Sequence, residues 1–108
     1  MSSQHWLSWE ALTEICIIDY FISNDLHELQ SFTTANLIDG YGSTLRKMRP
    51  DNVDIRATVN IQLNELIKSN NLVKPVRGIY NIAPGGQLMY KLYAKKMELE
   101  FNQIHKSN

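Results

Sequence analysis

One domain with a single modest core is predicted over 1–108, because the chain has 108 residues, of which 44% are hydrophobic and 20% are charged. The apolar run around Asp19 is too short to span a bilayer, and the N-terminal residues lack the basic and apolar stretches of a secretory signal. The formal net charge is zero, which alone argues weakly against nucleic acid, and the lone Cys16 excludes an internal disulfide and favours a cytoplasmic location.

The first predicted element is a helix over about 8–24. Ser8 is a suitable N-cap, and the pair Asn24-Asp25 ends the apolar periodicity. Cys16 lies among apolar neighbours, so we expect a buried structural thiol there. The apolar side of this helix is Leu12, Ile15, Cys16, Tyr20 and Ile22.

A short helix is expected next, within SFTTANLIDGYG. Thr33 or Thr34 can cap its start, and Gly40 and Gly42 are expected to close it. The stretch STLRKMRPDN that follows is interpreted as a basic connection that could hold another short turn of helix around Leu45 and Met48.

The most clearly periodic helix is predicted over about 52–69. Pro50 favours the entry into it, and Asp51 or Asn52 is expected to cap it. One buried stripe would consist of Ile55, Val59, Leu63, Leu66 and Ile67.

A two-stranded hairpin over about 72–82 follows, with Arg77 and Gly78 at its turn. Pro75 cannot donate a hydrogen bond to a strand partner, so it marks an edge strand. A long helix over about 86–105 completes the chain.

This order of elements predicts a mainly α fold with a small β-wing, namely a winged helix-turn-helix with an extra long C-terminal helix. In such a fold the helix over 52–69 is the recognition helix, which lies in the major groove of DNA. The hairpin then reaches the phosphate backbone or the minor groove, and a basic tip beside glycine allows close approach to the duplex.

Between Phe32 and Ile82 the chain carries, in order, FT, YGSTL, RPDNVDI, IQLNEL and RGIY. This pattern resembles the winged-helix domain at the C-terminus of methyl-directed restriction endonucleases of the DpnI and Dam-replacing type. The resemblance covers about half the chain and implies binding to duplex DNA, in that family at a methylated adenine. Neither the paired carboxylates of a nuclease domain nor a zinc-binding cysteine cluster accompanies it here.

Charge is unevenly distributed along the chain. Residues 1–42 contain six acids and no Lys or Arg, residues 43–96 contain ten bases and three acids, and residues 97–108 carry two acids and one base. The three segments therefore carry −6, +7 and −1. A basic half predicts a surface that meets phosphates, unless folding mixes the two halves into a neutral surface.

The outward face of the helix over 52–69 is predicted to contact bases. Asn60 and Asn64 could pair with adenine, Ala57 and Ile61 could contact a thymine or N6-methyl group, and Arg56 could reach phosphate or guanine. The alternatives are plain solvent exposure of the asparagines and cover of Ile61 by a terminal helix. Phosphate contacts are predicted from the remaining bases, with a solvated loop as the alternative; these are Arg46, Lys47, Arg49, Lys68, Lys74 and Arg77.

The last helix carries an apolar stripe. Because a helix of roughly 30 Å extends beyond a domain of this size, part of the stripe needs another surface to cover it, and we predict a homodimer through the terminal helices. The alternative is a monomer in which the stripe packs back onto Trp6, Trp9 and the first helix. The predicted dimerisation stripe has spacings of three and four and comprises Tyr90, Tyr93, Met97, Phe101 and Ile104.

No catalytic or cofactor motif is found, so we expect neither enzyme activity, nor a metal, nor a cofactor. His5, His27 and His105 lack the spacing of metal ligands. The leading hypothesis is a small regulator or accessory factor that binds duplex DNA. The alternative is a protein-protein interaction module, such as an adaptor or inhibitor, that uses the same surface.

Overall fold

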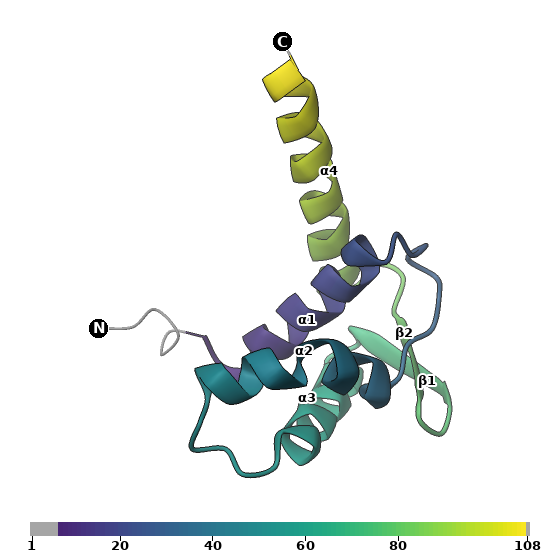
Figure 1. Ribbon diagram of the computed structural model, residues 1–108. Helices are drawn as coiled ribbons and strands as arrows, with labels where there is room; N and C mark the ends of the chain where they lie inside the picture. The colour runs from purple at the N-terminus through teal and green to yellow at the C-terminus, as the bar shows by residue number, and fades with distance from the viewer. Residues whose placement is uncertain (1–6, 108) are drawn as a thin grey trace.

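A computed structural model describes residues 7–107, which form four helices and one two-stranded antiparallel sheet (Figure 1). The expectation of a mainly α chain with a small β-hairpin is confirmed. In chain order the elements are α1 (Trp9–Ser23), α2 (Thr34–Met48), α3 (Ile55–Lys68), β1 (Leu72–Val76), β2 (Ile79–Ile82) and α4 (Gln87–Ser107).

Side-chain caps fix the starts of the first two helices. The Ser8 side chain accepts a hydrogen bond from the Ala11 N–H at 3.0 Å and caps α1. Thr33 caps α2 in a reciprocal capping box with Asn36, whose side-chain oxygen accepts from the Thr33 N–H at 2.8 Å. Two otherwise unpaired backbone donors are satisfied at this one helix start.

The prediction that Gly40 and Gly42 end a short helix is wrong. Both glycines lie inside α2, which continues to Met48. The free energy gained by burying Leu37 and Leu45 on one side of a single helix outweighs the roughly 1 kcal/mol that each interior glycine costs. Arg46 is consequently held on a helix and not in a loop.

The start of α3 also differs from the prediction. Asn52 does not cap the helix; its side-chain oxygen accepts from the Asp54 N–H at 2.9 Å, in a turn that precedes it. Asp54 is the N-cap and accepts from the Ala57 N–H at 3.0 Å, so α3 begins at Ile55. The asparagine delays the helix because its side chain stabilises a competing local turn.

A backbone bridge ties the hairpin to the segment between α1 and α2. Arg77 and Gly78 form its two-residue turn, where Gly78 adopts a φ of 81° that favours glycine. On the side away from β1, Tyr80 forms an isolated antiparallel bridge with Phe32, with both N–H···O distances at 2.9 Å. The segment between α1 and α2 therefore adds a third, very short strand position beside β2.

The core lies around α3, which packs against α1, α2 and β1. Its Leu63 and Leu66 side chains are fully buried. Phe21 of α1 meets Phe32 edge to face at a centroid distance of 5.9 Å, so aromatic contacts extend the core towards the hairpin.

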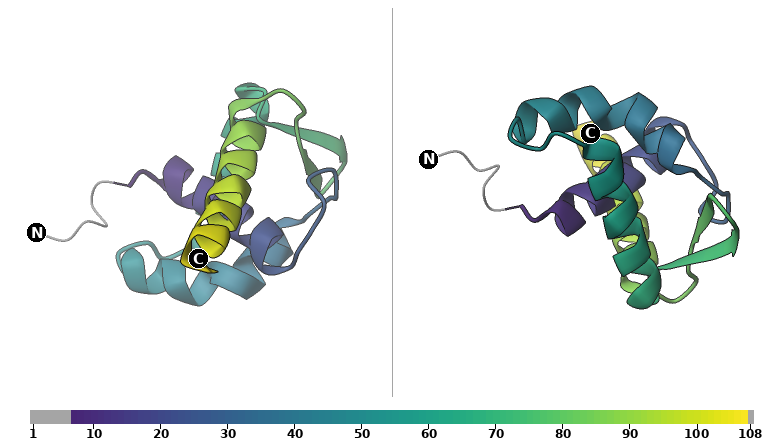
Figure 2. Two further views of the ribbon diagram at one scale, coloured as in Figure 1. Left: turned by 90° about the horizontal axis from the view of Figure 1, so that it is seen from above. Right: turned by 90° about the horizontal axis from the view of Figure 1, so that it is seen from below.

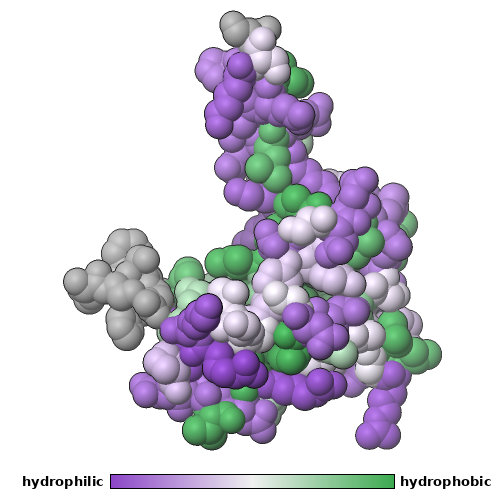
Figure 3. All heavy atoms as spheres, in the orientation of Figure 1, coloured by the Kyte–Doolittle hydropathy of each residue, from purple (hydrophilic) through white to green (hydrophobic). Residues whose placement is uncertain are grey.

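Only the first turns of α4 belong to this core, through Leu88, Met89 and Leu92. The remainder projects from the body on the side opposite α3 (Figure 1), and apolar surface lies among hydrophilic residues along it (Figure 3). None of the helices in the described range combines the length and apolar character needed to cross a membrane.

We expect Gly86→Ala to lower the free energy of unfolding by about 1–3 kcal/mol. The added Cβ would lie 2.9 Å from the Asn70 carbonyl oxygen and 3.3 Å from the Asn71 side-chain oxygen, which accepts from the Leu88 N–H at 2.9 Å. The matched control is Gly40→Ala, where nothing lies within 4 Å of the new Cβ. Gly40→Ala should raise the free energy of unfolding by about 0.5–1 kcal/mol. Urea unfolding measures both variants, and an equal change at the two positions would contradict this account.

Candidate nucleic-acid interface

The outward face of α3 carries most of the residues predicted to contact bases. Arg56, Ala57 and Asn64 are exposed, and Ile61 keeps 57% of its surface accessible. The terminal helix does not cover Ile61, because α4 projects from the opposite side of the molecule (Figure 1). This face is therefore free to meet another molecule.

Asn60 lies differently from Asn64. It is half-buried between α2 and α3, and its side-chain oxygen accepts a hydrogen bond from the Thr34 hydroxyl at 2.6 Å. Bidentate pairing with adenine requires that oxygen together with the amide N–H₂ group. Asn64 is exposed and has no such bond to another helix, so it is the better placed of the two for a base contact.

Three predicted phosphate-binding residues lie at the end of α2 and directly after it. Arg46 and Lys47 are exposed in the last turn, where cations also interact favourably with the helix dipole. Arg49 is half-buried, and its guanidinium donates to the backbone carbonyls of Leu7 and Met48. Arg46 and Lys47 are thus available to a ligand, while Arg49 also anchors the chain ahead of α1.

The hairpin supplies two more exposed bases. Lys74 places its ammonium 5.4 Å from the centre of the buried Tyr80 ring, a cation–π arrangement. Arg77 lies at the exposed turn. Tyr80 itself is 4% exposed, so it packs in the core as expected and offers no platform for a base.

Ion pairing divides the basic residues into two groups. On α4, Lys91 pairs with Glu14 at 2.7 Å, Lys96 with Glu28 at 3.7 Å and Lys95 with Glu98 at 3.5 Å. Within residues 7–107 seven other bases have no ion-pair partner. Lys106 is near the end of α4, and the remaining six lie on α2, directly after it, on α3 and on the hairpin: Arg46, Lys47, Arg49, Arg56, Lys74 and Arg77. Lys68, in the last turn of α3, pairs with Glu65 at 3.4 Å.

Apart from Lys106, these unpaired bases lie on α3 itself or on the α2 end and the hairpin. Seen from below, α3 runs in front, with α2 across its upper end and the hairpin beside its lower part (Figure 2). The acids that neutralise α4 belong to α1, to the segment after it and to α4 itself. Folding therefore does not mix the two charged halves of the sequence evenly, and it leaves the α3 side basic.

Apolar side chains interrupt this basic surface. Val53 is fully exposed just before α3, and Ile61 lies on the outward face. Val53 could be identified from the sequence only as a neighbour of the predicted face, because the turn made by Asn52 displaces it from the helix. Asp54 also contributes a negative charge at the helix start.

The predicted dimerisation stripe on α4 is largely exposed. Tyr90, Met97, Phe101 and Ile104 have between 58% and 74% of their surface accessible, so this stripe does not pack back onto α1. Trp6, part of that alternative, lies outside the described residues, and Trp9 packs against the core.

Tyr93, the fifth residue of the stripe, is tied to its own chain. Its hydroxyl donates to Glu28 at 2.7 Å, which lowers the pKa of Glu28 and raises the pKa of Tyr93. This contact helps to fix α4 against the segment after α1.

Two further titratable groups, Cys16 and Tyr41, have pKa values shifted by their surroundings. Burial raises the pKa of the Cys16 thiol to about 11, with a smaller contribution from the Asp19 charge, so this thiol stays protonated near neutral pH. Burial, followed by a hydrogen bond to Asp19, also raises the pKa of Tyr41. In the described part of the chain no three His, Cys, Asp or Glu side chains converge on a metal-sized site. His5 lies outside it.

Neither a protein-family model, nor a curated protein sequence, nor a solved structure matches this chain.

Proposed function

We propose that this chain is a winged helix-turn-helix protein that binds duplex DNA, with α3 in the major groove and the β1–β2 hairpin on the backbone. The element order supports this assignment, because three helices precede a hairpin and the Phe32–Tyr80 bridge supplies the additional strand position beside it. In such folds the hairpin acts as the wing and flanks the recognition helix.

The observation that carries the proposal is the group of unpaired bases around an exposed helix face. In this proposal Arg46 and Lys47, exposed in the last turn of α2, and Lys74 and Arg77, exposed on the hairpin, contact phosphates that flank the groove occupied by α3. Asn64 is placed to hydrogen-bond a base edge, and Ala57 and Ile61 to contact methyl groups. This division between phosphate and base contacts is typical of sequence-specific binding.

The proposed role is that of a regulator or accessory DNA-binding factor, acting without catalysis, metal or cofactor. A protein partner on the same face is the second candidate, and the exposed Val53 and Ile61 favour it. The two candidates differ in salt dependence, since phosphate contacts release counterions from DNA and contacts between apolar surfaces do not.

We expect the double change Arg46→Ala, Lys47→Ala to weaken binding to random-sequence duplex DNA and to reduce the slope of log K against log salt by about two. Arg77→Ala should reduce that slope by about one. Fluorescence anisotropy with a labelled duplex at several salt concentrations measures both effects.

The matched control is Lys95→Ala, Lys106→Ala, which removes the same net charge from α4, away from the α3 face. Its slope should equal that of the unchanged protein. Two outcomes would replace DNA binding with the protein-partner function. One is the absence of salt-dependent binding to DNA, and the other is an equal reduction of the salt slope in the control and in the α2 variant.

A second expectation concerns specificity. After selection of a preferred site from a randomised duplex pool, Asn64→Ala should reduce discrimination at one A·T pair by about 1–3 kcal/mol, because a bidentate contact is lost. Asn102→Ala on α4 serves as the control and should leave discrimination unchanged. Titration of duplexes that differ at single base pairs gives the comparison, and unaltered discrimination by the Asn64 variant would remove this residue from the base-contacting set.

A further inference from the structure

The projecting part of α4 carries a second apolar edge, which we call the α4 seam. Its residues alternate at spacings of four and three, the repeat of a helix that packs along another helix. At 3.6 residues per turn, Met97 lies about 140° around the helix from the buried Leu92, so the seam does not continue the core-facing side. The α4 seam consists of Tyr90, Ala94, Met97, Phe101 and Ile104.

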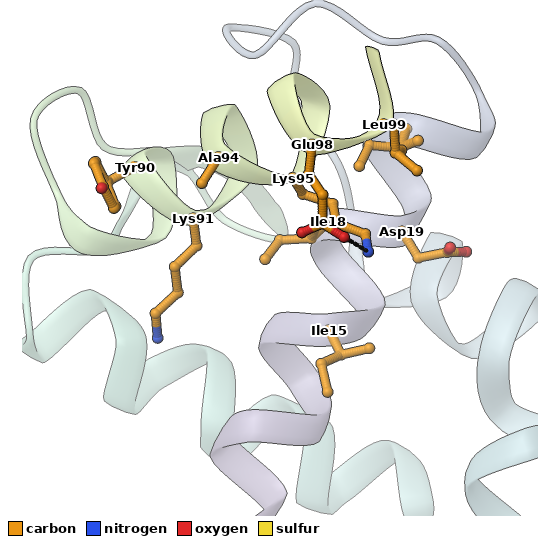
Figure 4. Close-up of a pocket in the computed structure, with 10 residues that line it drawn as sticks. Ile15, Ile18, Asp19, Tyr90, Lys91, Ala94, Lys95, Glu98 and Leu99 are labelled. Carbon is orange, nitrogen blue, oxygen red and sulfur yellow. Dashed lines mark hydrogen bonds and ion pairs between the residues drawn. The ribbon is translucent and has the colours of Figure 1, made fainter. Parts of the chain in front are cut away.

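A groove runs beside the α4 seam. It has a volume of about 520 Å³ and lies between α1 and α4, where Ile15 and Ile18 face the side of α4 that bears Ala94 (Figure 4). Tyr90 and Ala94 belong to both the groove and the α4 seam. The two apolar surfaces are therefore continuous, and one partner can cover both.

We infer that a second copy of this chain covers them, with the two α4 helices side by side and antiparallel. In this arrangement the partner's Met97 and Phe101 pack on Ala94 and Tyr90, and the partner's Phe101 also reaches Ile15 across the groove. Each copy does the same to the other, as a two-fold interface requires. The inference concerns assembly and does not rest on the proposed binding to DNA.

The charges of α4 favour the antiparallel direction. Its first half carries Lys91, Lys95 and Lys96, whereas Glu98 and Glu100 follow in the second half. Parallel helices would place like charges of the two copies side by side, which is unfavourable. Antiparallel helices place the basic half of one copy beside the acidic part of the other. The partner's Glu98 would then join Lys91, which already pairs with Glu14 of its own chain.

The size of the surface favours the same direction. The α4 seam spans 15 residues, or roughly 22 Å, and two helices in contact over so short a length form a marginal pair by themselves. A parallel pair would hold the two projecting ends together and leave both grooves empty. An antiparallel pair brings each projecting end to the partner's groove, so two further apolar contacts add to the helix contact.

Engineered disulfides distinguish the two directions. Chains with Tyr90→Cys and chains with Phe101→Cys are mixed in equal amounts at tens of micromolar and oxidised. We expect the mixed disulfide to exceed the two like-with-like disulfides at least tenfold. Like positions are separated by roughly 16 Å in the antiparallel register, and a disulfide requires Cα atoms within about 7 Å. The native Cys16 thiol is buried and does not compete.

Sedimentation equilibrium tests the interface itself. Met97→Asp should raise the dissociation constant of the dimer by about tenfold or more, because it places a charge in an apolar contact. Asn102→Asp adds the same charge at an exposed position about 140° around α4 from Met97. It should change the dissociation constant of the dimer less than about twofold. Circular dichroism establishes that both variants are folded, as expected for exposed positions. A monomeric full-length chain at tens of micromolar, predominant like-with-like disulfides, or equal effects of the two aspartates would each overturn the inference.

Discussion

The contact between Phe32 and Tyr80 fixes the hairpin relative to the helices. Two backbone hydrogen bonds of 2.9 Å join these residues, and their rings stack at a centroid distance of 5.8 Å. Phe32 also contacts Phe21 of α1 and directly precedes the α2 cap Thr33. Beyond this junction the hairpin contributes Leu72 of β1 and Ile82 of β2 to the core. The positions of Lys74 and Arg77 on the hairpin therefore depend on buried residues of the core.

Much of the fold could be predicted from local signals, and the errors have a common cause. Ser8, Thr33 and the Arg77-Gly78 turn were identifiable because capping and tight turns depend on a few neighbouring residues. The length of α2 was not, because it depends on burial of Leu45 in a core formed by distant parts of the chain. The delayed start of α3 depends on the orientation of the Asn52 side chain, which spacing alone does not reveal.

In the candidate site, too, some features follow from local sequence and others from contacts between distant residues. Exposure of Arg56, Ile61 and Asn64 follows from the periodicity of α3 and could be predicted from it. The bond from Thr34 to Asn60 joins residues 26 positions apart and separates two asparagines that are equivalent in the sequence pattern. Tertiary contacts thus decide which of several similar side chains remains available to a ligand.

The distribution of charge links the two proposed surfaces. Glu14 and Glu28, two of the six acids in residues 1–42, pair with lysines on α4. The α3 side consequently keeps its positive charge in a protein whose net charge is zero. The same pairs also hold the start of α4 to α1 and leave its far half projecting, with Met97 and Phe101 exposed. One set of ion pairs therefore separates a basic face from an apolar one, so the two proposed partners would bind different faces and would not compete.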